Sequence, residues 1–246
     1  MPWRVDTNPY YVLVSELMLQ QTQVERVIPK FLQFITRFPT IAALAEAPLS
    51  DVLTLWSGLG YNRRAKFLHE AAQKVTKDFN GTIPDQFDQL IKLPGVGPNT
   101  AGAILAYSFN QPVTFVETNI RTVYFHHFFE DQPSVSDEDL REIIAATIDH
   151  EHPREWYWAL MDYGAFLKKQ GVGRIDKSTH YHKQAPLKGS LREVRGMILR
   201  ALTAGDMSAK KLAAAMPADE RFARALAALL AEGLIDQTSN RLHLRR

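Results

Sequence analysis

The sequence predicts an all-α protein of 246 residues that ends in a small unit of helices and one β-hairpin. Helical periodicity is the main observation, because apolar residues recur every three or four positions, as at Tyr11, Val14, Leu17 and Met18. Runs that alternate apolar and polar residues are nearly absent before residue 234. At roughly 100–200 residues per domain, the length fits one large domain or a large domain plus a small one.

Helix-breaking and helix-capping residues divide the first 167 residues into short helices, of which we expect eight to ten. Pro9 precedes the first long helix, and Pro29 and Pro39 interrupt or bound the next ones. Thr40 and Ser50 are suited to cap the helices that follow them. Residues 1–167 therefore form the predicted all-α body.

Residues 168–189 break this pattern, since glycine, proline and lysine concentrate there and apolar residues are sparse, which indicates a basic connector. We then expect helices at 191–203, 208–216 and 219–232, the last ending at Gly233 as a C-cap glycine. Two short strands follow at 234–237 and 241–244, joined around Ser239 and Asn240. Three helices and a hairpin make residues 190–246 winged-helix-like, with a small dimerisation or packing module as the alternative.

The composition excludes several classes of protein. The chain has no cysteine, which rules out disulfides, thiolate zinc sites and cysteine-ligated iron–sulfur clusters. No run of about 18 apolar residues exists, so no membrane span is predicted. The start of the sequence lacks the apolar stretch of a signal peptide. We therefore expect a cytoplasmic monomer, associated with the nucleoid if the source is bacterial or archaeal.

The net charge of +2 hides an asymmetry between the two parts of the chain. Residues 1–167 carry 13 basic and 20 acidic side chains, whereas residues 168–246 carry 16 basic and 7 acidic ones. Such a contrast favours a polyanion-binding second part on an acidic body. The alternative is a solvated basic face without a partner.

The most informative segment reads LPGVGPNTAG over residues 93–102. A helix that ends at Leu93 is expected to meet a tight turn with two glycines, and a new helix to begin near Pro98. Glycines allow close approach of the backbone to a ligand, and the free amides at a helix start attract an anion such as a DNA phosphate. The turn carbonyls of residues 93–97 can also hold Na⁺ or K⁺. This is the helix-hairpin-helix signature, with a plain turn between helices as the alternative.

Further motifs surround the hairpin in a fixed order: WR at 3–4, VSELMLQQTQV at 14–24, WSGLGY at 56–61, FVETNIR at 115–121 and LMDYGA at 160–165. This set resembles the helix-hairpin-helix (HhH-GPD) DNA glycosylases, and within them the adenine-mismatch (MutY-like) glycosylases. The resemblance implies two all-α domains around a cleft into which double-stranded DNA releases a flipped, mismatched or damaged nucleotide. Flipping is needed because the glycosidic bond cannot be reached inside the base stack.

The resemblance also implies catalytic roles for three residues. Glu16 matches the glutamate that protonates the adenine, which requires burial to raise its pKa; a buried, hydrogen-bonded structural glutamate is the alternative. Glu117 stands where the family has an aspartate that stabilises the oxocarbenium-like sugar, so its side chain is longer by one methylene. Asn119 matches the family's asparagine.

The expected DNA contacts come from the glutamine-rich run, the hairpin and the basic connector, with Gln21 as the wedge into the base stack. They are Gln20, Gln21, Tyr61, Leu93, Gly95, Val96, Gly97, Asn99, Thr100, Lys168, Lys169, Lys177, His180 and Lys183. The last five stand where relatives have an iron–sulfur cluster loop, so we expect neither that cluster nor any metal held by side chains. The hairpin also lacks the lysine of the lyase branch, which predicts hydrolysis with weak or no strand cleavage.

Three functions remain open on the sequence. The glutamine-rich run favours an adenine glycosylase acting opposite guanine or 8-oxoguanine. Asn62 and Asn99 replace aromatic residues that are common in adenine glycosylases, which favours a uracil or thymine mismatch glycosylase. Glu117 and the winged-helix-like unit suggest a DNA-binding protein with weak catalysis that recognises lesions.

Overall fold

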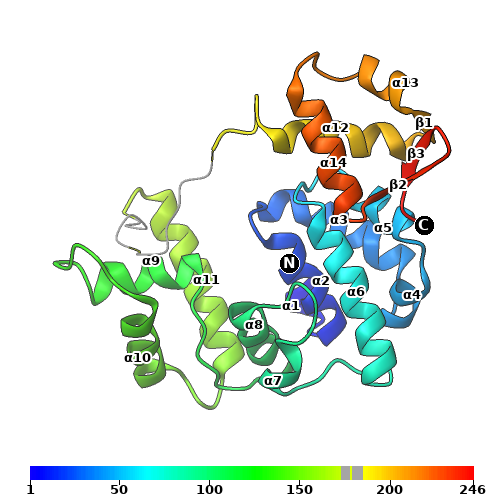
Figure 1. Cartoon of the computed structure of the whole chain (residues 1–246). Helices are drawn as coiled ribbons and strands as arrows, with labels where there is room; N and C mark the ends of the chain where they lie inside the picture. Colours follow the sequence, from blue (N-terminus) through cyan, green and yellow to red (C-terminus); the bar gives the residue numbers. More distant parts are fainter. Residues whose placement is uncertain (173–177, 179–184) are drawn as a thin grey trace.

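A computed structural model gives the structure of residues 1–172, 178 and 185–246 (Figure 1). Three of the expected DNA contacts, Lys177, His180 and Lys183, lie outside these described residues. The helices of the body are α1 (Pro2–Val5), α2 (Pro9–Leu19), α3 (Val24–Arg37), α4 (Ile41–Glu46), α5 (Leu49–Trp56), α6 (Arg63–Asp78), α7 (Phe87–Leu90), α8 (Pro98–Phe109), α9 (Thr118–His127), α10 (Asp137–Thr147) and α11 (Pro153–Lys169).

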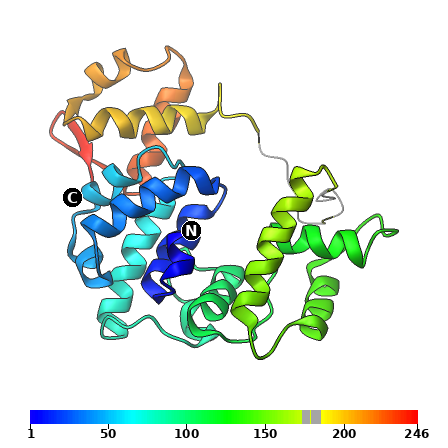
Figure 2. The same cartoon turned by 180° about the vertical axis from the view of Figure 1, so that it is seen from behind.

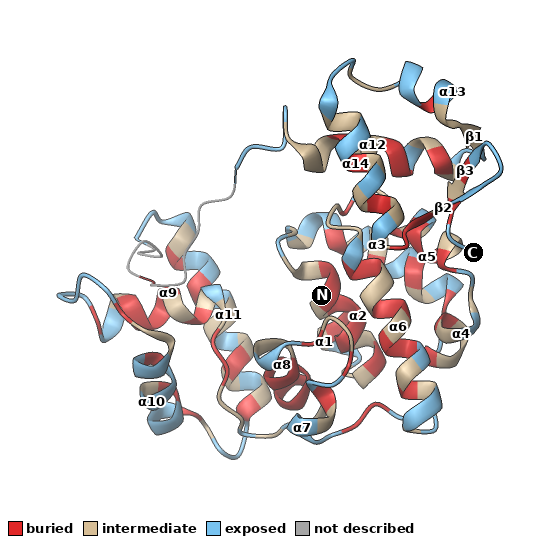
Figure 3. Ribbon diagram, in the orientation of Figure 1, coloured by how far each residue is buried: buried red, intermediate tan, exposed pale blue. Residues whose placement is uncertain are grey.

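Helix α2 is the central helix of the body. It packs against α3, α6 and α8, and α5 packs against both α3 and α6. Helix α2 is largely buried (Figure 3), and its buried residues include Val12, Leu13, Val14, Leu17 and Met18, so apolar side chains cover almost its whole circumference. An acidic residue on such a helix lies among apolar neighbours, and Glu16 is that residue.

Helices α9, α10 and α11 form a second group, which both views place opposite α3–α6 (Figures 1 and 2). Helix α11 packs along α9 and also touches α8. The chain therefore has two helical groups, with α2 and α8 in the first facing α9 and α11 in the second. This arrangement confirms the all-α prediction for residues 1–167.

Several helix ends differ from the sequence predictions. Residues 1–172 contain eleven helices, because α1 and α7 have four residues each and show no periodicity. Thr40 caps α4 as predicted, but Pro48 is the N-cap of α5 and Ser50 lies inside that helix. Pro29 lies within α3 without ending it. The helix before the hairpin ends at Leu90 rather than Leu93.

Residues 191–244 form the predicted three helices and hairpin. The elements are α12 (Leu191–Thr203), β1 (Met207–Ser208), α13 (Ala209–Ala214), α14 (Glu220–Ala231), β2 (Ile235–Thr238) and β3 (Arg241–Leu244), with the strands antiparallel in the order β1-β3-β2. Strand β1 was not predicted, since two residues are too few to show alternation. Gly233 has a φ of +64°, and the amide of Leu234 completes the end of α14 by donating to Leu229, so β2 begins one residue later than predicted.

This C-terminal unit lies against the body at α5 and α6. Helix α12 and strand β3 both pack on α5. The carboxylate of Glu232 accepts two hydrogen bonds from Arg195, at 3.0 and 2.6 Å, and lies 3.7 Å from Arg63. The ammonium of Lys66 donates to the Glu232 backbone carbonyl. Polar contacts from one turn of α6 therefore hold the end of α14.

Candidate active site

Two carboxyl groups from different elements approach each other between the two helical groups. Glu16 belongs to α2, and Glu117 is the N-cap of α9. The pKa of Glu16 is raised to about 8, chiefly by burial and also by the negative charge of Glu117, while Arg4 opposes both effects. Among the described residues the Glu16 carboxyl has no hydrogen-bond partner. A carboxyl with this pKa is largely protonated at neutral pH and can donate a proton.

The side chain of Glu117 is held by its own helix. One carboxylate oxygen accepts a hydrogen bond from the backbone N–H of Asn119 at 2.6 Å, the usual contact of a helix N-cap. The longer glutamate therefore bends back to cap α9. The cap fixes one oxygen and leaves the negative charge at the side of the site that Glu16 occupies.

Asn119 is fixed from two sides. Lys168, on the last turn of α11, donates a 2.7 Å hydrogen bond to the side-chain oxygen of Asn119. A Cβ on Gly164 would lie 2.2 Å from the backbone oxygen of Asn119, so α9 and α11 touch backbone to backbone there. Burial lowers the pKa of Lys168, while the nearby Glu117 raises it. Lys168, predicted as a phosphate contact, thus lies within the site.

Arg4, Tyr107 and Trp158 complete the surroundings of the two carboxyl groups, and none of these three was predicted as a site residue from the sequence. The Arg4 guanidinium lies 5.5 Å from the centre of the Trp158 ring and 2.8 Å from Asp162. Burial and the two glutamates raise the pKa of Tyr107 well above its ordinary value, so its phenol stays protonated. The sequence features that could have pointed to these residues were the Trp-Arg motif at residues 3–4 and a tyrosine within the apolar run of α8.

The glutamine-rich run ends α2 beside the hairpin. Gln20 is the C-cap of α2, and its amide donates to the Thr100 hydroxyl at 3.5 Å. Gln21 is exposed and has a φ of +59°, which turns the chain sharply out of the helix. The structure therefore brings Gln20, Gln21 and Thr100 together.

The hairpin itself packs closely on the body. Gly95 has a φ of +78°, and a Cβ there would lie 2.9 Å from Phe67, so both the turn and the packing require glycine. Gly97 is the N-cap of α8 and has open space around it. The side chains of Leu93 and Val96 are buried, so these two residues offer only backbone groups to a ligand.

Asn99 connects the hairpin helix to the second carboxylate. Its side-chain oxygen accepts a hydrogen bond from the Val116 N–H at 3.3 Å, directly before Glu117. Asn99 is therefore engaged within the protein in this structure. The asparagine that stands at this position in place of an aromatic residue thus bonds to the backbone just before Glu117.

Arg64 connects the end of α2 to the turn that carries Tyr61, and it was not predicted from the sequence. Its guanidinium is buried and donates to the carbonyls of Leu17 at 2.6 Å, Met18 at 2.9 Å and Gly60 at 3.1 Å. Burial lowers the pKa of Arg64 to about 10. Nothing in the sequence separates this arginine from its exposed neighbour Arg63, because both begin an amphipathic helix.

Tyr61 lies at the surface between the body and the C-terminal unit. It has a φ of +48°, and its hydroxyl accepts a hydrogen bond from Arg192 of α12. The guanidinium of Arg192 lies 5.2 Å from the centre of the Tyr61 ring. The C-terminal unit therefore contacts one of the expected DNA-binding residues directly.

The described residues do not provide a built metal site. Among them, no group of three histidine, aspartate or glutamate side chains could hold a metal ion. The chain has no cysteine, so it offers no thiolate donors for an iron–sulfur cluster, and the residues present do not fit that group. Lys169 is exposed at the end of α11. Across the described part of the chain, no helix has both the length and the apolar character needed to cross a membrane.

Comparison with known families decides which group of proteins shares this architecture. The family described as "HhH-GPD superfamily base excision DNA repair protein" matches residues 14–146, which include Glu16, the hairpin and Glu117. The chain belongs to this superfamily. Its fold agrees with that assignment, since the superfamily's hairpin lies between α7 and α8.

Individual relatives with known names are also similar to this chain. The adenine DNA glycosylase of Mycobacterium tuberculosis is 36% identical over 262 residues, covering 97% of this chain and 86% of the relative. That of Buchnera aphidicola (subsp. Baizongia pistaciae) is 39% identical over 171 residues, covering 68% of this chain. The chain spans 48% of the length of this Buchnera relative, about half.

A solved structure of a thermostable thymine-DNA glycosylase has a similar fold. The TM-score is 0.61 at 26% sequence identity, and the match covers 67% of this chain and 77% of that one.

Proposed function

We propose that this chain is an adenine DNA glycosylase of base excision repair, which hydrolyses the N-glycosidic bond of adenine mispaired with guanine or 8-oxoguanine. The observation that carries the proposal is the pair Glu16 and Glu117, in which one carboxyl is protonated at neutral pH while the other caps a helix. The adenine specificity is supported by the adenine DNA glycosylases of M. tuberculosis and B. aphidicola, to which the chain is similar.

The proposed reaction divides its steps between the two carboxyl groups. The protonated Glu16 donates its proton to a ring nitrogen of the flipped adenine, and the glycosidic bond breaks with its electron pair moving to the base. Glu117 stabilises the positive charge that develops on the sugar. Water then adds to the sugar carbon and gives up one proton to a carboxylate, which leaves an abasic site and free adenine.

We propose supporting roles for Lys168, Tyr107 and the Gln20–Gln21 turn. Lys168 holds the Asn119 side chain and partly balances the charge of Glu117. Tyr107, which keeps its proton, offers a hydroxyl beside both carboxyl groups. The Gln20–Gln21 turn fills the space that the flipped nucleotide leaves in the duplex, with Gln21 as the exposed wedge.

The proposed enzyme is monofunctional. The hairpin positions that follow Gly97 are Pro98, Asn99 and Thr100, which offer no amine to attack the sugar. The Lys168 ammonium is already bonded to Asn119. We also propose that the hairpin backbone of residues 93–97 binds a DNA phosphate together with Na⁺ or K⁺, and that residues 1–167 and 190–246 are separate domains joined by 168–189.

A panel of duplexes tests the proposed activity. Each duplex carries adenine, thymine or uracil opposite guanine or 8-oxoguanine, and base release and strand cleavage are measured in single turnover. We expect adenine release with an intact strand until alkali is added. Release of thymine or uracil alone would instead support a uracil or thymine mismatch glycosylase. The similarity to the thymine-DNA glycosylase structure is the observation that favours this alternative. Tight binding without any base release would identify a DNA-binding protein instead.

A further inference from the structure

A groove separates the turn at residues 57–64 from helix α12. Its volume is about 970 Å³, which falls in the range of pockets that hold a ligand the size of a nucleotide. One wall belongs to the body and includes Gln20, Gln21 and Tyr61, while the other belongs to α12. The groove therefore begins at the glutamine turn and continues along the C-terminal unit.

The groove carries an excess of positive charge. Six arginines and two glutamates line it. Glu232 is neutralised by Arg195 and Arg63, and Glu193 lies 3.9 Å from Arg221, which is not among the lining residues. Among the described residues, Arg26, Arg192 and Arg200 have no carboxylate partner. Their charges face the groove without compensation, which suits a polyanion.

Arg192 is only partly engaged. Its guanidinium donates to the Tyr61 hydroxyl and, at 3.2 Å, to the Ala185 carbonyl, and both acceptors are neutral. An arginine has five N–H donors, so donors and the full charge remain for a phosphate. Arg200 is exposed and lies about two turns further along α12. The two arginines stand eight residues apart on the same helix, about 12 Å along its axis, and both line the groove.

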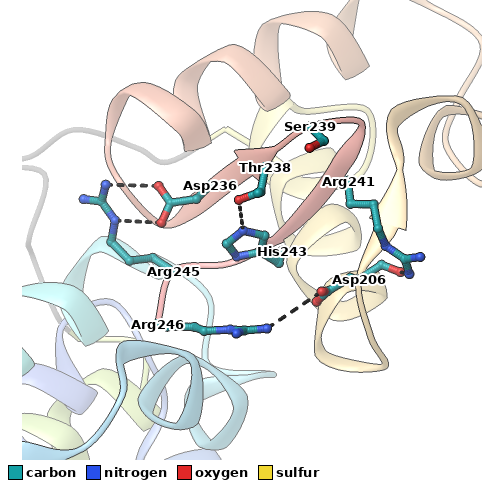
Figure 4. A pocket seen from close by; sticks show the side chains of 8 residues that line it. All are labelled: Asp206, Asp236, Thr238, Ser239, Arg241, His243, Arg245 and Arg246. Atoms are coloured by element: carbon teal, nitrogen blue, oxygen red, sulfur yellow. Dashed lines mark hydrogen bonds and ion pairs between the residues drawn. The ribbon is translucent and has the colours of Figure 1, made fainter.

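A second depression on the same unit provides a contrast (Figure 4). It lies at the hairpin, has a volume of about 510 Å³ and is lined by Arg241, Arg245 and Arg246. Arg245 makes two hydrogen bonds to Asp236, and Arg246 lies 3.9 Å from Asp206. Carboxylates thus pair with Arg245 and Arg246 at the hairpin, whereas Arg26, Arg192 and Arg200 of the groove have no carboxylate partner among the described residues.

We infer that the groove between residues 57–64 and α12 is a DNA-backbone site, in which Arg192 and Arg200 bind phosphates of the strand that passes the glutamine turn. This inference rests on the proposed function, because it places the C-terminal unit on the same duplex as the active site. The unit then supplies binding affinity and fixes the register of the DNA on the enzyme, while the glutamates carry out the chemistry.

The test measures how duplex affinity depends on salt. A duplex with an uncleavable abasic analogue opposite 8-oxoguanine is titrated with the full-length protein at several salt concentrations. We expect Arg192→Ala and Arg200→Ala each to weaken binding about tenfold and to reduce the slope of log affinity against log salt by about one. Arg192→Lys keeps the charge and should restore the slope.

Arg224→Ala is the matched control, since Arg224 is exposed on α14 and does not line the groove. It should leave the slope unchanged, and thermal unfolding confirms that each variant is folded. The inference is overturned if the two groove variants behave like Arg224→Ala, as they would if the groove held a protein partner, or if wild type does not bind the duplex. Groove-dependent binding without base release would refute the proposed activity alone.

Discussion

The ammonium of Lys168 lies 2.7 Å from the side-chain oxygen of Asn119, two residues after the carboxylate that caps the same helix. A single side chain from α11 therefore fixes the site next to Glu117. The hydrogen bond is charge-assisted and partly buried, which strengthens it.

Replacing Lys168 tests this support. In Lys168→Met the Asn119 side chain loses its partner, and displacement of a positioning group by about 1 Å can cost roughly 100-fold in rate. We expect single-turnover base release to slow by about 10- to 100-fold. Lys169→Met is the control, since Lys169 is exposed on the next position of α11. Equal effects of the two variants would contradict a role for the Lys168–Asn119 bond.

Shortening Glu117 separates its charge from its reach. Glu117→Asp still caps α9, because aspartate is a favoured N-cap residue, so unfolding by urea should change by less than about 0.5 kcal/mol. The contact between Gly164 and Asn119 prevents the backbone from moving to compensate. We expect base release to slow by about 10- to 100-fold. A faster Asp variant would show that the site prefers the shorter side chain.

Removing the charge of Glu117 gives a complementary result. In Glu117→Gln the amide oxygen can still accept the Asn119 N–H, so the helix cap remains. The sugar loses its nearby negative charge, and we expect a rate loss of about 100- to 1,000-fold. Duplex affinity, measured separately, should change little.

The raised pKa of Glu16 predicts the pH dependence of the reaction. The folded pKa is about 8 and the ordinary value is 4.5, so the acid form that donates the proton is lost as pH rises through 8. Base release should fall about tenfold per pH unit above that value. Glu16→Gln cannot donate a proton and should be slower by about 100- to 10,000-fold at every pH.

Stability should follow the same ionisation. Between pH 4.5 and 8 the folded protein binds the Glu16 proton and the unfolded chain does not, so the free energy of unfolding falls as pH rises. Glu16→Gln removes this dependence and should stabilise the protein at pH 8 by on the order of 1–4 kcal/mol. Urea unfolding at pH 5 and pH 8 measures the difference. A variant less stable than wild type at pH 8 would contradict a raised pKa.

Gly164 tests the contact between α9 and α11. In Gly164→Ala the new methyl would lie 2.2 Å from the Asn119 backbone oxygen, so the helices must separate. We expect a loss of about 1–3 kcal/mol in stability. In Gly196→Ala the nearest atom is 3.5 Å away, at the end of the flexible Arg200 side chain, and we expect a gain of about 0.5–1 kcal/mol.

The sequence predicted the helical body, the hairpin and the C-terminal unit because periodicity and turn residues are local signals. It failed at α1, α7 and β1, which are too short to show a period. It placed Glu16 in an apolar helix, and the structure supplies the second cause of its raised pKa, the charge of Glu117.

Residues whose importance depends on tertiary contacts could not be found in this way. Arg64 looks like any arginine at the start of an amphipathic helix, yet its carbonyl partners lie at the end of α2 and in the turn before α6. Tyr107 resembles a core aromatic, and only the fold brings it beside two glutamates. Lys168 was assigned to a basic surface because its neighbours are basic, whereas its partner Asn119 lies 49 residues earlier.

The first turn of α6 contacts two different parts of the molecule. Arg64 closes the end of the helix that carries Glu16, while Arg63 and Lys66, on either side of it, hold Glu232 in the C-terminal unit. We therefore expect positions 63, 64 and 66 to differ in how freely they vary among homologues. Homologues that have exchanged the C-terminal unit for another domain should vary freely at positions 63 and 66 and retain arginine at 64. That pattern would record which partner domain a lineage has kept.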